Sequence, residues 1–185
     1  IIVFAITFLN ANNSKSLEGT LAPHWSLKTF LGEFKHLGNY SVPLNKKIRG
    51  NNVRKVVVQS FFASWCQPCI KEISELQKIQ EQYQEDDVEF FLINLTDYFK
   101  NKDGAGKKYK QAPDAETFLK AKGLDKIKVL NDPTGRTARA YKVKDVLPRL
   151  FIIDKYGIVR KDETGLCSTC LNDEVVPLIE KLLAE

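Results

Sequence analysis

The sequence predicts an α/β fold with a central mixed sheet and helices on both faces. Two segments, residues 53–63 and 88–95, are rich in β-branched and aromatic residues, as buried strands are. An amphipathic helix follows the first strand, and a strand hairpin and a closing helix end the chain. Strand, helix, strand, hairpin and helix in this order are typical of a sheet that helices cover on both sides.

The composition is that of one globular domain. The 185 residues are 43% apolar and 28% charged, with a net charge of +5. The most basic stretch, residues 100–110, holds five lysines beside Asp103 and two glycines. We expect a solvated loop there rather than an anion-binding patch. Because no dense basic stripe with interleaved aromatic residues occurs, the sequence argues against a nucleic-acid partner.

The chain starts with nine residues that are apolar except for Thr7. A membrane-spanning helix needs about 20 such residues, so this segment is too short to cross a bilayer alone. It fits the apolar region of a secretory signal, with cleavage after Ala11, or the remnant of a membrane anchor. The alternative is an extra packed strand or helix. We expect residues 1–16 to be this remnant and a linker, and residues 17–185 to form the domain.

The first half of the domain is expected to hold a hairpin, two strands and a helix. Residues 17–31 predict a lead-in hairpin, because short extended pieces alternate with Pro and Gly. After Cys69, apolar residues recur every three or four positions, which predicts an amphipathic helix of about four turns. These positions are Ile70, Ile73, Leu76, Ile79 and Tyr83.

The second half is expected to alternate short helices and strands. The helices are residues 115–122, closed by Gly123, and 137–141; the extended pieces are 129–132, 150–153 and 157–160, the last two joined by a hairpin turn. The last helix should start near Asn172 or Asp173, both good caps, because Pro177 is tolerated only in a first turn.

Two cysteines two residues apart, Cys66 and Cys69, lie where the first strand meets the amphipathic helix. Unpaired N–H groups and the macrodipole at a helix N-terminus favour a thiolate, so Cys66 is the expected nucleophile. Cys69, one turn later, can attack the mixed disulfide, and Pro68 fits the first turn. Zinc binding is the competing interpretation of a single C-x-x-C, and the flanking strand and helix favour redox chemistry.

The segment F-F-A-S-W-C-Q-P-C at residues 61–69 resembles the active site of thioredoxins, most closely the TlpA/ResA-like exported branch. The resemblance runs from about Leu17 to the C-terminus. A-P-H-W-S-L at 22–27 looks like that branch's N-terminal hairpin. V-L-N-D-P-T-G at 129–135 with A-Y-K-V at 140–143 looks like its inserted helix region, and residues 147–157 look like its cis-proline strand and hairpin. The resemblance implies a thioredoxin-like fold with an N-terminal hairpin extension and a central helical insertion.

The resemblance also implies roles for residues around the cysteines. Pro148 should be the cis-proline that faces the disulfide, and a trans proline opening a strand is the alternative. The family usually has a small polar residue before this proline, whereas Leu147 would offer an apolar contact. We expect the substrate groove to include the three residues next to Cys66 together with Leu147. Those three are Trp65, Gln67 and Pro68.

Glu72 lies three residues after Cys69 and therefore on the same face of the helix. In the TlpA/ResA-like branch an acid here exchanges protons with the second cysteine. The alternative is an ordinary acid near a helix start, favoured by the dipole alone. Cytoplasmic thioredoxins instead bury an Asp six residues before the first cysteine, a position that Ser60 occupies here.

A second pair, Cys167 and Cys170, departs from the family pattern. Three interpretations remain open: a static disulfide that braces the loop, a second redox pair, and metal binding by one pair or both. A C-x-x-C disulfide closes little chain, so its stabilising effect through loop entropy is modest. Since the final strand should run back toward the active-site end, this loop should lie at the same end of the molecule as Cys66.

These observations predict an extracytoplasmic thiol–disulfide oxidoreductase that exchanges its Cys66/Cys69 disulfide with protein substrates, as a reductant. We expect it to act as a monomer without a cofactor, and a redox partner to recycle the cysteine pair. The N-terminal segment could tether the protein to a membrane. Four cysteines in two pairs are compatible with an oxidising compartment. The alternative is a metal-binding carrier of the same fold that uses both cysteine pairs.

Overall fold

A computed structural model describes residues 16–48, 53–83, 87–167 and 169–185. One mixed sheet of seven strands has the order β2-β1-β5-β4-β3-β6-β7. Its strands are β1 (Ser26–Lys28), β2 (Phe34–His36), β3 (Val56–Phe62), β4 (Val88–Asn94), β5 (Lys128–Asn131), β6 (Arg149–Ile153) and β7 (Val159–Thr164). The long helices are α1 (Gln67–Gln80) and α6 (Val176–Ala184), and the short ones are α2 (Thr96–Lys100), α3 (Lys107–Lys110), α4 (Ala115–Ala121) and α5 (Arg136–Ala140).

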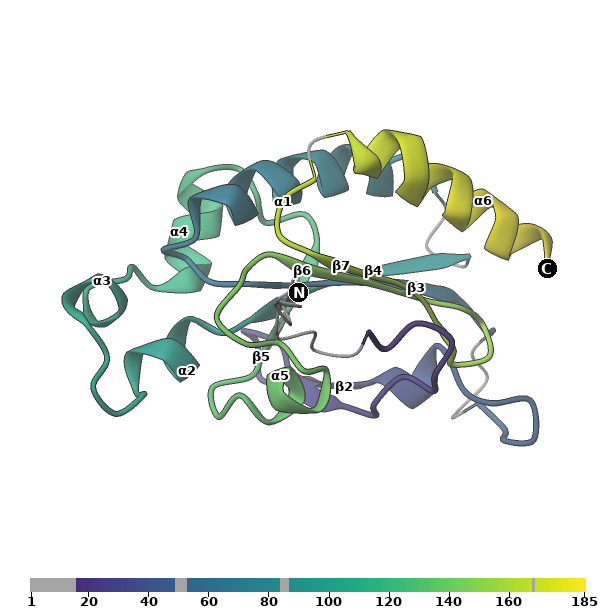
Figure 1. Cartoon of the computed structure of the whole chain (residues 1–185), viewed down its shortest axis with the longest axis horizontal. Coiled ribbons are helices and arrows are strands. Elements are labelled where there is room, and N and C mark those ends of the chain that lie inside the picture. Colours follow the sequence, from purple (N-terminus) through teal and green to yellow (C-terminus); the bar gives the residue numbers. More distant parts are fainter. Residues whose placement is uncertain (1–15, 49–52, 84–86, 168) are drawn as a thin grey trace, which may run out of the picture.

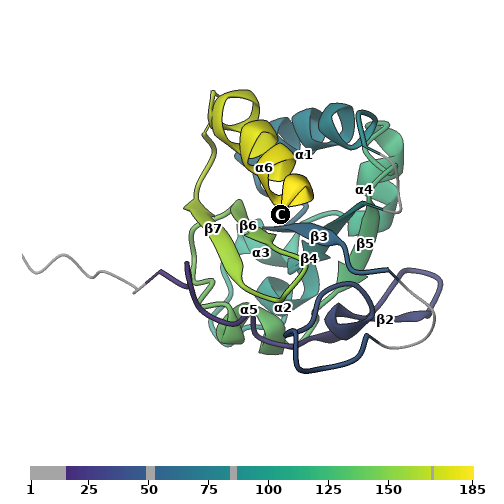
Figure 2. The same cartoon turned by 90° about the vertical axis from the view of Figure 1, so that its right-hand side faces the viewer.

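Helices cover both faces of this sheet. The views in Figures 1 and 2 agree that α1 and α6 lie side by side over one face and α5 lies on the other. Strands β3, β4 and β5 run parallel, and β6 and β7 continue the sheet antiparallel to their neighbours. The predicted α/β class, mixed sheet, N-terminal hairpin and helical insertion are therefore confirmed.

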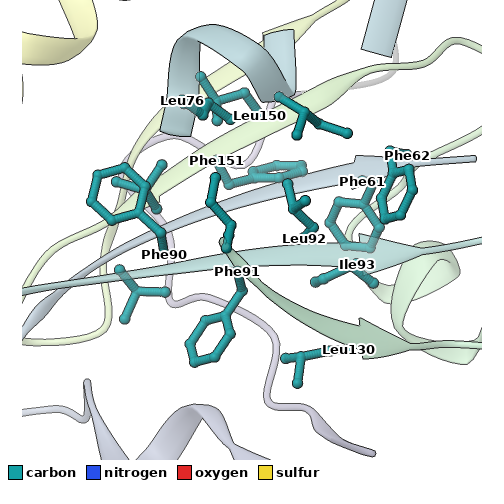
Figure 3. Packing of buried hydrophobic residues seen from close by; sticks show 14 of the residues in the cluster. Phe61, Phe62, Leu76, Phe90, Phe91, Leu92, Ile93, Leu130, Leu150 and Phe151 are labelled. Atoms are coloured by element: carbon teal, nitrogen blue, oxygen red, sulfur yellow. The ribbon is translucent and has the colours of Figure 1, made fainter. Parts of the chain in front are cut away.

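The two central strands are buried along their whole length, as their continuous apolar sequences predict. Figure 3 shows their side chains packed with those of β6 and α1. Phe61, Tyr141 and Phe151 form an aromatic cluster whose ring centroids are 4.9–5.8 Å apart. This packing holds β3, and with it the start of α1, in a fixed position.

Two polar residues interrupt β3, Gln59 and Ser60, and they point to opposite faces of the sheet because successive strand side chains alternate. The Gln59 carbonyl accepts a hydrogen bond of 2.9 Å from the indole Nε1 of Trp25. The Ser60 hydroxyl donates to Glu72 on α1. The Gln59 oxygen and the Ser60 hydroxyl are therefore partnered inside the core, whereas the Gln59 Nε2 atom has no hydrogen-bond partner among the described residues.

The N-terminal hairpin lies later in the chain than predicted. It is formed by β1 and β2, so it spans residues 26–36 instead of 17–31. The preceding residues instead follow β7, where Gly19 N donates to Val159 O and Leu21 bridges Ile158. Long-range pairing with β7 therefore satisfies the backbone polar groups of these residues. The pattern of Pro and Gly in the sequence does not reveal such pairing.

The last strand is longer than predicted. Strand β7 begins at Val159 and runs on to Thr164, through charged residues that look like a loop in the sequence. Arg149 forms a buried ion pair of 2.5 Å with Asp162, and Lys161 pairs with Glu174. These partners satisfy the charges, and the β6 backbone continues the ladder.

The closing helical run starts near the predicted position, at Leu171, but Asn172 and Asp173 do not cap it. A π-helical turn, η2 (Leu171–Val175), follows Cys170 and leads directly into α6. Pro177 therefore lies in the first turn of α6 but inside a continuous helical run. The π-helical turn widens the helix just before Pro177, which has no N–H to donate. The helical run therefore tolerates this proline. Cys167 precedes this run and Cys170 starts it.

The lysine-rich stretch is only in part the solvated loop that the composition predicts: residues 101–106 form turns and a loop, mostly exposed, but helices flank them. Helix α2 ends at Lys100, and residues 107–110 form α3. Tyr109 in α3 stacks on Phe99 in α2, with ring centroids 5.6 Å apart. This aromatic contact anchors the stretch, while most of the lysines stay exposed.

The expectations for residues 1–15 lie outside the described residues. Among the helices that the structure does describe, none has both the length and the apolar character needed to cross a membrane.

The start of α5 provides a stability test. Gly135 has φ +65°, and a Cβ there would lie 2.5 Å from the ring of Tyr98; Gly123 has the same φ and open space around it. Gly123→Ala should lower the free energy of unfolding by about 1–2 kcal/mol through the left-handed backbone alone. Gly135→Ala should lower it by a further ~1–3 kcal/mol through the clash. Denaturant unfolding measures both, and equal losses would show that Tyr98 moves aside without cost.

Candidate active site

The first cysteine pair lies where β3 gives way to α1. Cys66 and Cys69 form a disulfide, with Cα atoms 5.3 Å apart. Cys66 is the N-cap of α1, and its Sγ accepts a hydrogen bond of 3.3 Å from the backbone N–H of Cys69. Pro68 lies in the first turn, where no intrahelical donor is lost. A thiolate at Cys66 would thus meet a donor and the positive end of the helix dipole.

Access to the pair is narrow. Cys66 is 3% exposed and Cys69 is 1% exposed. Gln67 and Pro68, between them in sequence, are exposed. A reaction partner therefore has to approach over these two residues, and Cys66 is slightly more exposed than Cys69.

Glu72 lies one turn after Cys69, on the buried face of α1, and is 2% exposed. Burial raises the pKa of Glu72 to about 7, the Ser60 hydrogen bond opposes this rise, and repulsion from Glu163 adds to it. A carboxyl group that titrates near neutral pH can both take up and release a proton there. The sequence pointed to Glu72 by its spacing from Cys69. Ser60, which with Gln59 interrupts the apolar sequence of β3, was the available signal for its partner.

The Leu147–Pro148 peptide bond is cis, as expected. Arg149 opens β6 opposite Phe61 of β3, so Pro148 lies at the same edge of the sheet as the start of α1. Its carbonyl accepts a hydrogen bond of 2.8 Å from Gly165 N. Leu147 is only 8% exposed, so it offers less surface to a substrate than expected.

Trp65 is half-buried in an aromatic cluster that the sequence analysis missed. Its ring meets Phe99 and Tyr109 edge-to-face, at centroid distances of 5.2 and 4.8 Å. The Nζ atom of Lys108 lies 4.4 Å from its ring centroid. Three aromatic residues in an otherwise polar stretch, Tyr98, Phe99 and Tyr109, were the available signal. Helices α2 and α3 thereby hold the residue before Cys66 in place.

The second pair, Cys167 and Cys170, lies just beyond β7 and is also a disulfide. Phe61, Arg149 and Thr164 lie opposite one another on β3, β6 and β7, so β7 ends at the edge where α1 begins. The sequence-based placement at the active-site end is therefore confirmed. Each cysteine is bonded within its own pair.

A metal at the second pair would need donors that are otherwise engaged. One ligand atom from each of Glu163, Cys170 and Glu174 lies within 4.8 Å of the others. Lys161 already bridges the two carboxylates, at 3.4 and 2.6 Å. An ammonium group in this position supplies the positive charge that a cation would bring.

Comparison with known proteins supports the redox interpretation. The AhpC/TSA family matches residues 19–162. Thioredoxin-like protein YneN of Bacillus subtilis is 30% identical over 148 residues, which are 80% of this chain and 72% of that protein. Thiol-disulfide oxidoreductase ResA of Geobacillus thermodenitrificans is 29% identical over 147 residues, 80% of this chain and 69% of that protein.

The fold has solved relatives as well. The crystal structure of a candidate thiol:disulfide interchange protein DsbE from Chlorobium tepidum is 25% identical, with a TM-score of 0.66, and the match covers 92% of this chain and 100% of that one. The architecture, the C-x-x-C pair at the start of α1 and these relatives agree. The chain belongs to the AhpC/TSA family and is a thioredoxin-like thiol–disulfide oxidoreductase.

Proposed function

We propose that this protein is located outside the cytoplasm and reduces disulfides in other proteins. In this reaction Cys66 is the attacking thiol and Cys69 is the resolving thiol. The observation that carries the assignment is the hydrogen bond from Cys69 N to Cys66 Sγ at the N-terminus of α1. This donor and the helix dipole stabilise a thiolate on Cys66, and the thiolate is the nucleophilic form.

The reaction proceeds by two exchanges. The Cys66 thiolate attacks a substrate disulfide, forms a mixed disulfide and releases one substrate sulfur as a thiolate, which takes a proton. Cys69 then gives its proton to the Glu72 carboxylate and attacks the Cys66 sulfur. The second substrate sulfur leaves as a thiolate and takes a proton, so the substrate departs as a dithiol, and the protein retains the Cys66–Cys69 disulfide, having lost two electrons. A dithiol protein has to restore the reduced pair.

Glu72 suits the second exchange because its pKa of about 7 lies between those of an ordinary carboxyl and a thiol. Cys69 is buried, so its proton needs an acceptor inside the protein. Glu72 is one turn away on the same face of α1. A titratable group matched to neutral pH moves this proton in either direction.

The same carboxyl group bears on the direction of electron flow. A strong oxidant of this fold owes its potential to a stabilised reduced form, whose thiolate is favoured. Here the helix start stabilises a thiolate on Cys66, but burial and a neighbouring acid disfavour charge at Cys69, so the reduced form is stabilised at one sulfur only. We expect a potential below about −220 mV, closer to the ~−270 mV of thioredoxin than to the ~−120 mV of DsbA.

Features outside the active site support the proposed location and assembly. The apolar start of the chain and the absence of an unpaired cysteine among its four favour an exported protein, tethered or released. Protein disulfides are the substrates and a dithiol protein is the recycling partner. We propose that the protein works as a monomer, because one chain carries the pair, Glu72 and Pro148.

Alkylation of the reduced protein tests the assignment of the thiols. With limiting iodoacetamide at neutral pH, Cys66 should be labelled before Cys69, as read by peptide mass spectrometry. Equilibration of Cys66/Cys69 with glutathione and with dithiothreitol redox buffers, which together cover the high and low ranges, gives the potential. Faster labelling of Cys69 would contradict the assignment of the thiols. A potential near that of DsbA would contradict the proposal that the protein acts as a reductant.

A further inference from the structure

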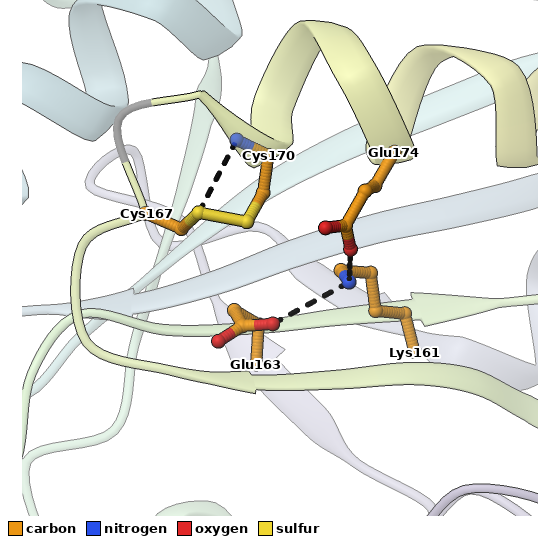
Figure 4. Close-up of a disulfide and its surroundings, with 5 residues drawn as sticks. All are labelled: Lys161, Glu163, Cys167, Cys170 and Glu174. Carbon is orange, nitrogen blue, oxygen red and sulfur yellow. Dashed lines mark hydrogen bonds and ion pairs between the residues drawn. A yellow bond between two sulfur atoms is a disulfide. The ribbon is translucent and has the colours of Figure 1, made fainter.

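The second cysteine pair repeats the local geometry of the first. Its Cα atoms are also 5.3 Å apart. Cys170 N donates a hydrogen bond of 3.2 Å to Cys167 Sγ, as Cys69 N does to Cys66 Sγ at 3.3 Å. Figure 4 shows Cys170 at the start of the closing helix, with Cys167 in the segment that leads to it. The first sulfur of each pair therefore accepts an N–H from the start of a helix.

The second pair is easier to reach than the first. Both Cys167 and Cys170 are half-buried, whereas Cys66 and Cys69 are almost completely covered. Gly165, two residues before Cys167, donates to the carbonyl of the cis-proline. The pair therefore lies near the cis-proline, and its cysteines are accessible to a partner protein.

The fold needs little bracing where this disulfide lies. It closes a loop of only four residues, so its entropic contribution is small. The helical run after it is held by apolar side chains that are at most 3% exposed. These are Leu171, Val175, Ile179 and Leu182. Core packing therefore fixes the helix independently of the disulfide.

Two carboxylates lie beside Cys170. Carboxylate oxygens of Glu163 and Glu174 lie within 4.8 Å of its sulfur, and Lys161 bridges the two acids. Figure 4 shows the acids and Lys161 beside the disulfide. An acid near the second cysteine is a further likeness to the first pair, where Glu72 has this position.

The two acidic sites lie on one face of the sheet. Ser60 of β3 is opposite Leu150 of β6, which is opposite Glu163 of β7. Side chains in register point to the same face, and Ser60 binds Glu72 on that face. The Glu163 carboxylate accordingly contributes to raising the pKa of Glu72.

We propose that Cys167 and Cys170 form a second redox-active site that accepts electrons from a dithiol protein. The attacking thiolate of that protein breaks the Cys167–Cys170 bond and forms a mixed disulfide with one of the two sulfurs. Its second thiol then resolves the mixed disulfide. The partner leaves oxidised, and this pair holds two electrons and two protons as a dithiol. In the reverse reaction Cys167 attacks first, because Cys170 N–H stabilises its thiolate.

A variant that holds only the second pair tests the proposal. Cys66→Ser/Cys69→Ser is equilibrated with mixtures of reduced and oxidised dithiothreitol, alkylated and weighed, while circular dichroism reports folding. We expect one two-electron transition within these mixtures in a protein that stays folded. A pair that stays oxidised in reduced dithiothreitol, or is reduced only as the protein unfolds, would be a structural brace and overturn the proposal.

Single substitutions in the same background identify the attacking thiol. Cys170→Ser leaves Cys167, and Cys167→Ser leaves Cys170. If Cys170 N–H lowers the pKa of the Cys167 thiol by about one unit, Cys167 should react with iodoacetamide about threefold faster at pH 7 than Cys170 does, because tenfold more thiolate is partly offset by its lower nucleophilicity. Equal rates, or a faster Cys170, would overturn its assignment as the attacking thiol.

The matched control holds only the first pair. Cys167→Ser/Cys170→Ser should remain folded and reduce insulin at the wild-type rate with dithiothreitol as the electron source. The function proposed for Cys66/Cys69 fails if this variant is inactive, whereas the second site fails if the other double variant does not titrate. The two results are independent of each other.

Discussion

Cys66→Ser should lower insulin reduction to the rate measured without protein. A serine hydroxyl is not ionised at neutral pH, so the step that opens the substrate disulfide has no nucleophile. The fold should be retained, because Cys66 is a helix N-cap and serine is a preferred residue there. Insulin turbidity with dithiothreitol as electron donor measures the rate, and circular dichroism reports the fold.

Cys69→Ser should instead trap the protein on its substrates. Without the second thiol, the mixed disulfide at Cys66 is not resolved and accumulates. Non-reducing electrophoresis should show adducts that disappear on addition of dithiothreitol. Adducts that form in Cys66→Ser but not in Cys69→Ser would reverse the two roles. Both variants are made in the Cys167→Ser/Cys170→Ser background, so that the second pair contributes no adduct.

Glu72→Gln should remove a pH dependence of stability from the oxidised protein. In the folded state the pKa of Glu72 is about 7, above its ordinary value of 4.5, so the folded protein binds more protons than the unfolded chain between these pH values. The free energy of unfolding therefore falls as pH rises from about 4.5 to 7, by roughly 3 kcal/mol in all. Below pH 4.5 the carboxyl is protonated in both states and the loss is absent.

Denaturant unfolding of the oxidised protein at several pH values measures this effect. Glu72→Gln should flatten the wild-type decline and be more stable than wild type above pH 7. Glu75→Gln is the control, because Glu75 lies on the same helix but pairs with Lys78 at the surface. A wild-type slope in Glu72→Gln would mean that another group causes the decline. In the reduced protein Glu72→Gln should also shift thiol titration and slow exchange.

Local patterns in the sequence predict much of the fold and the reactive centre. The apolar runs of β3 and β4 and the periodicity of α1 arise from burial of neighbouring residues, so they can be read along the chain. The spacing of Cys66 and Cys69 at a strand–helix junction indicates thiol chemistry in the same way. The resemblance to a known family added Pro148, whose cis peptide bond the structure confirms.

Tertiary contacts decided the elements that the sequence analysis placed wrongly. The charges of β7 look like a loop until Arg149 and Glu174 supply their partners across the sheet and from the helix. Helix α3 looks like a solvated loop until Tyr109 meets Trp65, 44 positions earlier in the chain. A partner far away in sequence leaves no local periodicity, so a single chain read in order does not reveal it.

The sequence by itself determined the fold class, the two cysteine pairs and the acid one turn after Cys69. Only the tertiary structure decided the environment that sets their chemistry. It places Glu72 against Ser60, brings Glu163 near enough to repel it, and leaves Cys167 and Cys170 half-buried beside two acids. Reactivity depends on burial and on charges a few ångströms away, and folding alone brings these residues from separate strands and helices together.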